Sequence, residues 1–328
     1  MGLFDDVMAV GNSFMKSRVV LTAAELDLFT LIDESPRTGE EAAGQLKLHV
    51  RALTRLLDAL VTLDLLEKDK DVYRVTSVGA LYSSRHPETM LPMALHMNRL
   101  WHGWTGLTDV VRRGPNPSSQ PGKGMDERDR KAFIGAMHVV GRKLSAEIAE
   151  SIDLGRFRCL LDIGAGSGTY TMAFLNRNPN MTAVLFDLAS VIPMAKERME
   201  AAGLAQRVKF VAGDFHEDEL PGGCDLALLS AIIHQNSPEE NISLYSKILK
   251  ALQPGGTLLI RDHIMDESRT CPPLGAMFAL NMLINTPGGD TYTWSEVEES
   301  LKQAGFIDIQ RMRKGERMDC LAAAVKPA

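Results

Sequence analysis

Three glycines stand close together after a short apolar run, at Gly164, Gly166 and Gly168. Because glycine has no side chain, a ligand can lie directly against the backbone of such a loop. In a Rossmann-like fold, the loop between the first strand and the first helix holds a nucleotide-containing ligand in this way. Asp162 precedes the loop and could either brace it or accept a hydrogen bond from an ammonium group of the ligand. The pattern predicts a cofactor site at residues 162–168.

Two further apolar runs end in residues that suit a nucleoside. Asp187 comes about twenty residues beyond the glycines, where a carboxylate can accept hydrogen bonds from both ribose hydroxyls. Asp214 and Phe215 follow the next run, where an acid can bond to the adenine amino group and a ring can stack on the base. The dinucleotide fingerprint would need glycine at Thr169. The spacing therefore disfavours NAD, whereas Asp187 suits the ribose of either NAD or S-adenosylmethionine.

His234 is the candidate for proton transfer. It follows a fourth apolar run, at the carboxyl edge where such folds place their sites. Methyl transfer from a sulfonium is an in-line displacement, so the protein must align the reactants and remove one proton from the acceptor. Imidazole can take that proton near neutral pH. An isolated histidine, however, more often has a surface or helix-start role.

These side chains need a scaffold that brings strand ends together. Short apolar runs alternate with helical stretches from residue 155 onward, which predicts a parallel sheet covered by helices on both faces. We therefore place a domain boundary near residue 155. The expected strands cover residues 159–163, 183–186, 208–211, 226–229 and 257–261.

The first 154 residues have helical periodicity instead. A helix over residues 14–32, a short helix capped at Thr38 and a leucine-rich helix over residues 50–66 precede a small hairpin around residues 72–75. This order is typical of a winged helix. Two long helices are expected at residues 91–111 and 125–152, separated by a Pro/Gly/Ser loop at residues 114–122.

Composition limits the partners. The 328 residues are 45% apolar, enough for two cores, and carry a net charge of −6. Residues 37–74 hold seven basic and seven acidic side chains, so the winged helix lacks a surface for nucleic acid and is expected to pack against another subunit. The four cysteines are far apart in sequence, with no metal-binding spacing, and no membrane segment is seen. These features favour a cytoplasmic protein that binds a small molecule, with no metal.

From Leu160 onward, and more loosely from Val19, the sequence resembles the class I S-adenosylmethionine-dependent O-methyltransferases related to plant caffeate and animal acetylserotonin enzymes. The resemblance includes the leucine-rich helix, Trp101-x-x-Trp104, Phe133-x-x-Ala136-Met137 and the turn at residues 253–256. It implies an α/β fold, a Rossmann-like doubly wound sheet, preceded by an all-helical winged-helix dimerisation domain. Residues 1–154 would form a homodimer and cover the substrate, and residues 155–328 would bind S-adenosylmethionine and catalyse the reaction.

The resemblance also assigns roles to residues. His234 matches the catalytic base of the family's His-Asp-Trp motif, and Asp262 matches the carboxylate that orients it. Gln235-Asn236 replace Asp-Trp, and Thr291 stands where many relatives have a second glutamate, so the base is expected to be weaker or its substrate more acidic. Trp101, Met137, Met282, Asn285 and Thr286 would line the acceptor pocket. The predicted cofactor residues are Asp162, Gly164, Ala165, Gly166, Gly168, Asp187, Leu188, Gly213, Asp214, Phe215 and Ser230.

The expected reaction is methylation of a hydroxyl group on a small, aromatic molecule. Three alternatives stay open. The same scaffold could methylate carbon or nitrogen, because the cofactor residues would be identical. A winged-helix regulator could bind S-adenosylmethionine without catalysis. A relative could keep the cofactor and catalyse a decarboxylation or hydroxylation, which the altered Gln235-Asn236 would allow.

Overall fold

The computed structural model describes residues 2–118 and 125–328. The chain forms two compact units. The N-terminal unit comprises Met1–His102 and Met125–Val139, and the sheet unit comprises Gly103–Gly124 and Val140–Ala328.

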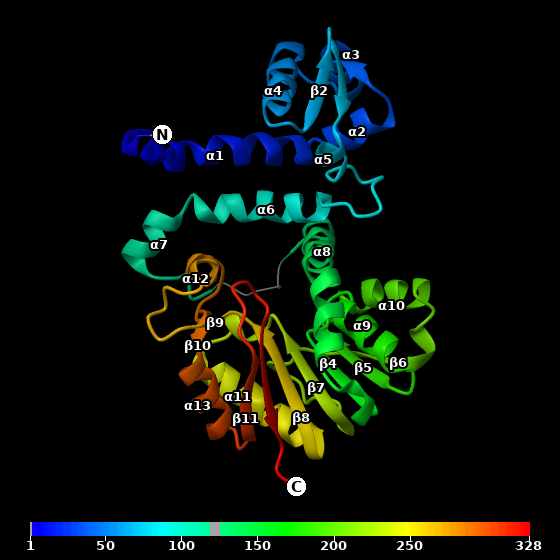
Figure 1. The fold of residues 1–328 in the computed structure, drawn as a ribbon, viewed down its shortest axis with the longest axis vertical. Helices are drawn as coiled ribbons and strands as arrows, with labels where there is room; N and C mark the ends of the chain where they lie inside the picture. The colour runs from blue at the N-terminus through cyan, green and yellow to red at the C-terminus, as the bar shows by residue number, and fades with distance from the viewer. Residues whose placement is uncertain (1, 119–124) are drawn as a thin grey trace. The chain divides into compact units, whose positions relative to one another are not determined.

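A seven-stranded sheet forms the centre of the sheet unit, in the strand order β11-β12-β8-β7-β4-β5-β6 (Figure 1). Neighbouring strands from β8 to β6 are parallel, as predicted. Two further strands, which were not predicted, extend the sheet at one edge, where β12 runs antiparallel to both β8 and β11. The strands are β4 (Cys159–Ile163), β5 (Thr182–Asp187), β6 (Val208–Ala212), β7 (Cys224–Ser230), β8 (Leu252–Asp262), β11 (Ile307–Arg313) and β12 (Cys320–Val325).

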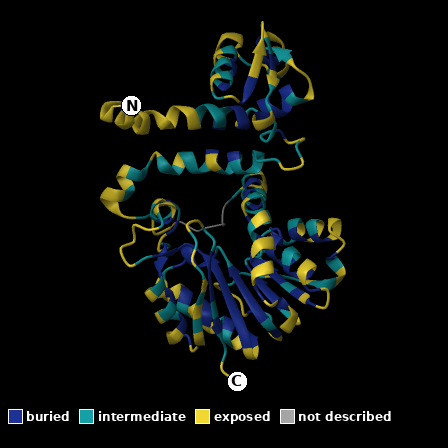
Figure 2. Ribbon diagram, in the orientation of Figure 1, coloured by how far each residue is buried: buried dark blue, intermediate teal, exposed yellow. Residues whose placement is uncertain are grey.

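Helices cover both faces of this sheet, with α9 and α10 on one side and α11 and α13 on the other (Figure 1). Each face has its own hydrophobic core, and the central strands β4 and β7 between the two cores are mostly buried (Figure 2). Burial on both faces explains why the strands are continuous apolar runs. The helices of the sheet unit are α7 (Leu107–Arg113), α9 (Thr169–Arg177), α10 (Ile192–Ala201), α11 (Pro238–Ala251), α12 (Pro273–Asn285) and α13 (Trp294–Gln303).

Short elements connect these helices and strands. Three 3₁₀ turns are η1 (Leu154–Arg156), η2 (Ala205–Arg207) and η3 (Ile233–Gln235), and η3 contains the candidate base. A two-stranded parallel sheet joins β9 (Ile264–Met265) to β10 (Tyr292–Thr293). Among the helices of the described ranges, none has the length and apolarity needed to cross a membrane.

The N-terminal unit has the predicted winged-helix order. The Thr38 hydroxyl accepts a hydrogen bond from the Glu41 amide at 3.2 Å, and the Glu41 carboxylate accepts from the Thr38 amide, which is a capping box. The single helix expected over residues 14–32 is instead two, because Asp27 adopts a left-handed conformation with φ of 53°. The elements are α1 (Leu3–Glu25), α2 (Leu28–Glu34), β1 (Arg37–Thr38), α3 (Gly39–Leu46), α4 (Val50–Thr62), β2 (Leu66–Asp69), β3 (Val72–Val75) and α5 (Ser77–Ala80).

Three helices link the winged helix to the sheet. The helix expected over residues 91–111 is broken near Gly106 into α6 (Leu91–Trp104) and α7, because glycine favours a turn over helix interior. The other predicted helix is observed as α8 (Glu127–Ser151). The predicted loop at residues 114–122 is irregular as far as Ser118, and its remaining residues lie outside the described ranges.

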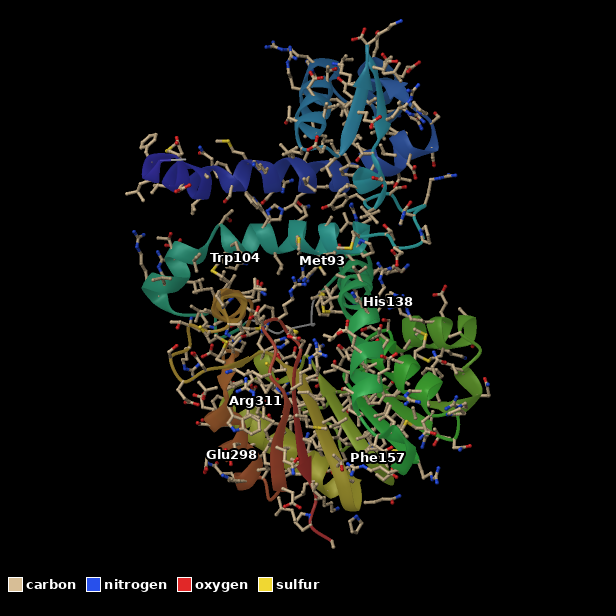
Figure 3. All side chains as sticks on the ribbon, in the orientation of Figure 1. Met93, Trp104, His138, Phe157, Glu298 and Arg311 are labelled. Atoms are coloured by element: carbon tan, nitrogen blue, oxygen red, sulfur yellow. A yellow bond between two sulfur atoms is a disulfide. The ribbon has the colours of Figure 1, made fainter. Side chains whose placement is uncertain are left out.

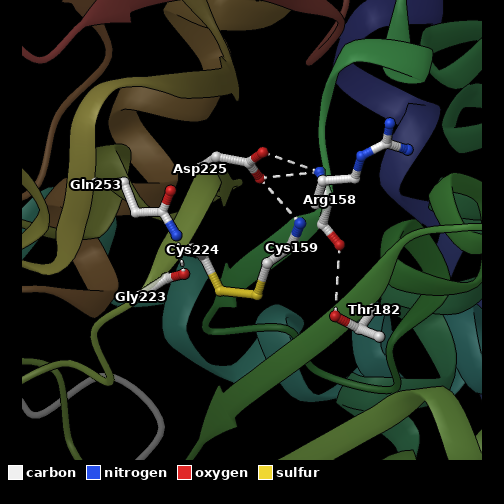
Figure 4. The surroundings of a disulfide bond; sticks show 7 residues. All are labelled: Arg158, Cys159, Thr182, Gly223, Cys224, Asp225 and Gln253. Atoms are coloured by element: carbon white, nitrogen blue, oxygen red, sulfur yellow. Dashed lines mark hydrogen bonds between the residues drawn. A yellow bond between two sulfur atoms is a disulfide. The ribbon is translucent and has the colours of Figure 1, made fainter.

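A disulfide joins the first residues of two neighbouring strands, Cys159 of β4 and Cys224 of β7, whose Cα atoms are 4.6 Å apart (Figure 4). The Asp225 carboxylate adds hydrogen bonds from the Arg158 and Cys159 amides at 2.9–3.1 Å. The four cysteines are far apart only along the sequence, because the sheet brings together residues 65 positions apart.

Candidate active site

The glycine loop after β4 has the conformation that its composition suggests. Gly164, Gly166 and Gly168 all have positive φ, at 67°, 58° and 73°. A Cβ atom on Gly164 would lie 2.4 Å from Ile232, and one on Gly168 would lie 2.4 Å from Met199. The left-handed backbone conformation therefore disfavours side chains here, and an added Cβ would also require Ile232 or Met199 to shift. The resulting bare backbone is the cradle that a nucleoside cofactor needs.

Two carboxylates flank this loop. Asp162 is buried, and its Oδ2 accepts a hydrogen bond from the Thr171 hydroxyl at 2.6 Å. Asp187 lies at the end of β5, where Oδ2 accepts from the Gly166 amide and Oδ1 from the Leu188 amide, both at 2.7 Å. Burial is the main reason that the pKa of each carboxyl is raised to about 6. Hydrogen-bond donors from a cofactor would favour the ionised form of both.

The loop after β6 is the third expected cofactor contact. Gly213 packs so closely on Phe186 that a Cβ atom would lie 2.5 Å from its ring. Asp214 Oδ1 accepts from the His216 amide at 3.0 Å, and the Phe215 ring lies 4.5 Å from the His216 ring. Lys247 holds this loop by donating to three backbone carbonyls at 2.8–3.1 Å. The loop is thus well defined beside the ribose carboxylate.

The strongest chemical feature is the pairing of His234 with Asp262. His234 Nδ1 lies 2.8 Å from Oδ1 and 3.0 Å from Oδ2 of Asp262, and both side chains are largely or fully buried. Burial by itself would raise the pKa of Asp262, but attraction to His234 and a hydrogen bond from it outweigh burial and lower the pKa. With Nδ1 donating to this carboxylate, the Nε2 lone pair is the site that can accept a proton.

Two aromatic residues that the sequence analysis missed surround this pair. The edge of Phe278, from α12, meets the His234 ring at 88° with 4.9 Å between ring centres. Phe278 also lies 5.0 Å from the ring of His263, which directly follows Asp262. His263 is buried, and burial lowers its pKa to about 4. The phenyl ring therefore fixes the orientation of the candidate base from a segment distant in sequence.

The backbone of His234 is held from another side by the loop after α12. A Cβ atom on Gly289 would lie 2.4 Å from the His234 carbonyl oxygen and 2.6 Å from Thr286 Oγ1. Gly289 has no positive φ, so only this close approach requires glycine. The hydroxyl of Tyr292 donates to the carbonyl of Asn236 in the same region. The positions that depart from the family motif are therefore part of the packed support of the histidine loop.

The predicted acceptor residues fall in both units. Met282, Asn285 and Thr286 lie at the end of α12, where the Thr286 hydroxyl donates to the Met282 carbonyl and accepts from the Gly289 amide, each at 2.8 Å. The Trp104 indole, labelled in Figure 3, donates to Asn281 Oδ1 of the same helix at 3.0 Å. Trp101 and Met137 belong to the N-terminal unit, so their place in the pocket stays a prediction.

The remaining predicted cofactor residues lie on the same edge of the sheet. Ala165 is in the glycine loop, where its carbonyl accepts from the Gly168 amide at 2.9 Å. Ser230 ends β7, and its hydroxyl accepts two hydrogen bonds from Arg261. Within the described ranges, no group of three His, Cys, Asp or Glu side chains could hold a metal ion.

A glycine loop after β4, a carboxylate after β5 and an acid and ring after β6 are the features of the Rossmann-like methyltransferases, whose cofactor is S-adenosylmethionine. Comparison with known families agrees with this class. Residues 104–307 match the O-methyltransferase domain, and residues 8–85 match the O-methyltransferase dimerisation domain. The chain belongs to this O-methyltransferase family and is an S-adenosylmethionine-dependent enzyme.

Individual relatives support the assignment over the whole chain. The tetracenomycin polyketide synthesis 8-O-methyl transferase of Streptomyces glaucescens is 30% identical over 98% of this chain and 96% of its own length. An N,N-dimethyltransferase of Streptomyces rimosus is 26% identical over 98% and 96%. The structure of human N-acetylserotonin methyltransferase in complex with S-adenosylmethionine superposes with a TM-score of 0.86 at 26% identity, covering all of both chains. The predicted fold, a helical dimerisation domain followed by a Rossmann-like domain, is confirmed.

Proposed function

We propose that the enzyme methylates a hydroxyl group of a small aromatic acceptor and that His234 is its general base. The observation that carries this proposal is the contact of His234 Nδ1 with both oxygens of the buried Asp262. Asp262 fixes the ring and stabilises the imidazolium that forms when Nε2 takes the acceptor proton. A deprotonated oxygen is the nucleophile that methyl transfer requires. Phe278 limits rotation of the ring in the same step.

The cofactor is assigned to the edge formed by β4, β5 and β6. Asp187 would accept from the ribose hydroxyls, Asp214 from the adenine amino group, and Asp162 from the ammonium group of the amino-acid end. When bound, S-adenosylmethionine supplies a methyl group on a positively charged sulfur. The left-handed glycines Gly164 and Gly168 support this assignment, because they leave a bare backbone against which the cofactor can lie.

The acceptor side is proposed from α12, where Met282, Asn285 and Thr286 would contact a flat apolar ring. The roles of Trp101 and Met137 in acceptor binding stay predictions. The Streptomyces glaucescens relative is an 8-O-methyl transferase of polyketide synthesis, which favours oxygen as the methylated atom. The N,N-dimethyltransferase relative supports nitrogen as the second candidate.

Matched acceptors test the atom that is methylated. A phenol and the aniline of the same ring would each be incubated with S-adenosylmethionine and wild-type or His234→Gln enzyme, and the products identified by mass spectrometry. We expect methylation of the phenol and a large loss with the variant. Methylation of the aniline alone, little changed by His234→Gln, would replace the proposal with N-methylation, because amines need less help from a base.

We also propose that the homodimer implied by the dimerisation domain forms through α1. Leu3, Phe4 and Val10 on this helix are each at least 75% exposed, which is unusual for large apolar side chains so close together (Figure 2). Changing Phe4 and Val10 to Glu should convert the dimer to a monomer in sedimentation velocity. Met312→Glu is a control, since this exposed apolar residue lies on β11 of the sheet unit. A functional boundary near residue 155 stays a prediction.

A further inference from the structure

Arg261, the second-last residue of β8, carries a buried positive charge. Only 5% of the residue is exposed. Its Nε and Nη2 donate to the Ser230 hydroxyl at 3.0 and 2.9 Å, and its Nη1 donates to the Met318 carbonyl at 2.8 Å. All these partners are neutral, and no carboxylate of the described residues forms an ion pair with it. A buried charge normally has a counterion, because desolvation without one is costly. The buried Asp162 and Asp262 act on this guanidinium through their charges, but neither bonds to it directly. The absence of a charged acceptor in direct contact points to a ligand.

A second buried donor lies beside this guanidinium. The Tyr170 ring is 5.0 Å from the Arg261 guanidinium carbon. Tyr170 is only 7% exposed, yet its hydroxyl makes no hydrogen bond within the described ranges. Burial raises the pKa of this phenol, and the nearby Ser230 opposes the rise. Three bonds use three of the five N–H groups of an arginine side chain, which leaves two. Two guanidinium donors and one phenol donor match the acceptor oxygens of a carboxylate.

The cluster lies where the amino-acid end of the cofactor would reach. Ser230 and Arg261 are paired in register on β7 and β8, and Tyr170 is in the first turn of α9 after the glycine loop. The strand order places β4 between β5 and β7. A ribose bound at Asp187 on β5 is therefore about two strand spacings, or about 10 Å, from β7. A cofactor that lies across the carboxyl end of β4 can span this distance between its ribose and its amino-acid end.

Charge complementarity favours the same orientation. Asp162, on β4 between the ribose site and β7, is the carboxylate proposed to bind the ammonium group. Arg261 acts on Asp162 through its charge but forms no ion pair with it, because the Asp162 carboxylate bonds to Thr171. An α-amino acid presents its ammonium and carboxylate side by side. Asp162 and Arg261 offer one site of each sign for these two groups.

We propose that Arg261, positioned by Ser230 and assisted by the Tyr170 hydroxyl, binds the carboxylate of the cofactor's amino-acid end. The assignment rests on the proposed cofactor site at Asp162 and Asp187. The sequence predicts position 261 only as part of a strand, so its pattern does not indicate this role. The competing explanation is structural, with Arg261 serving only to hold the Met318 carbonyl and the start of β12.

Two ligands separate these explanations. Isothermal titration would compare S-adenosylhomocysteine with its decarboxylated analogue, which keeps the adenosine and the ammonium group. We expect the wild type to prefer the carboxylate ligand by about 10- to 100-fold, the range for charge-assisted hydrogen bonds. Arg261→Gln should weaken the binding of S-adenosylhomocysteine by a similar factor and change the affinity for the analogue by less than about threefold. The variant would then bind the two ligands about equally well.

Further variants guard against loss of folding. Tyr170→Phe removes only the unbonded hydroxyl, so the free protein should keep or raise its melting temperature while S-adenosylhomocysteine binds about threefold more weakly. Arg261→Lys keeps the charge and should show an intermediate preference. Arg207→Gln is the matched control, because Arg207 also bonds to backbone carbonyls, those of Met181, Leu175 and Asn178, away from the site. It should leave the ratio of the two affinities unchanged.

The outcomes distinguish the assignment from the site on which it rests. If Arg261→Gln weakened the binding of both ligands equally, the carboxylate assignment would be overturned and Arg261 would be a structural residue. A wild type that binds both ligands equally would overturn it as well. If the wild type bound neither ligand, the cofactor site itself would be overturned, and the Arg261 assignment with it.

Discussion

The two edges of the active-site region are built in different ways. At the cofactor edge, the geometry comes mainly from the backbone of the strand-end loops. The glycines have positive φ, and Asp187 accepts from the amides of Leu188 beside it and of Gly166 on the neighbouring loop. At the histidine edge, three other segments contact the turn that carries His234. They are β8 through Asp262, α12 through Phe278, and the loop after α12 through Gly289.

This difference indicates how the two edges respond to change. A cofactor loop can lose one contact and keep its backbone conformation, because glycine and turn geometry are intrinsic to it. The histidine has no such intrinsic geometry, because it lies in a single 3₁₀ turn. Its orientation depends on partners that other parts of the fold supply. Substitutions at the two edges should therefore affect different kinetic parameters.

The largest effect is expected at the histidine edge. His234→Gln removes the proton acceptor and should lower kcat by about 100- to 10,000-fold, the usual contribution of a general base. The Kd of S-adenosylhomocysteine should change by less than twofold, because no cofactor contact is removed. Stopped-time product assays and titration calorimetry would measure the two quantities. Retention of more than a tenth of the wild-type kcat would remove His234 from the role of base.

The opposite pattern is expected at the cofactor edge. Asp187→Ala removes the proposed acceptor for the ribose hydroxyls. The Kd of S-adenosylhomocysteine should therefore rise by about 100-fold, the effect of losing hydrogen bonds to a charged group. At saturating S-adenosylmethionine, kcat should fall by less than threefold. Calorimetry and initial rates on the same preparation would check this. Unchanged affinity would show that the ribose binds elsewhere.

The same contrast sets what could be predicted from the sequence. Local signals were sufficient for the glycine loop, the Thr38 capping box and five parallel strands, because each depends on a few consecutive residues. The antiparallel pair β11 and β12 was missed, since Ile307–Arg313 is mostly exposed and Cys320–Val325 is rich in alanine, a weak strand former.

Contacts between distant segments were beyond sequence reasoning. Nothing in the pattern placed Phe278 or Gly289 against His234, and nothing joined Cys159 to Cys224 across two strands. The pairing of His234 with Asp262 was expected only from the resemblance to a family, and the structure shows its geometry. Tertiary packing supplies this information, because residues far apart in the chain become neighbours only when the sheet forms.

A smaller effect tests the support of the histidine. Gly289→Ala places a methyl group within 2.4 Å of the His234 carbonyl oxygen, so the turn must shift. We expect kcat to fall by about 10- to 30-fold, because small misplacement of a catalytic group is costly, while cofactor affinity is unchanged. Gly44→Ala is the matched control: this glycine lies in α3 with no atom within 4 Å of an added Cβ. If Gly289→Ala and Gly44→Ala gave equal rates, the histidine edge would be less dependent on packing than proposed.

The smallest expected effect is a pH dependence at the cofactor edge. Burial raises the pKa of Asp187 to about 6, and ribose hydroxyls bind to the ionised carboxylate. Affinity for S-adenosylhomocysteine should therefore rise by up to about tenfold from pH 5 to pH 7 and then level off. Part of this rise should disappear in Asp187→Asn, and the part that remains belongs to Asp162, whose pKa is also raised to about 6.

Stability of the free protein should change in the opposite direction over the same interval. The folded state keeps a proton on Asp187 up to about pH 6, whereas an unfolded aspartate loses it near pH 4. The native state therefore binds more protons between these values, and the contribution of Asp187 to the free energy of unfolding falls as the pH rises. Denaturant unfolding of the wild type and Asp187→Asn, compared at pH 4.5 and 6.5, would measure this contribution. A difference between the two proteins that is the same at both pH values would mean that Asp187 is already ionised in the free enzyme, and the pH dependence of binding would then have to come from Asp162 alone.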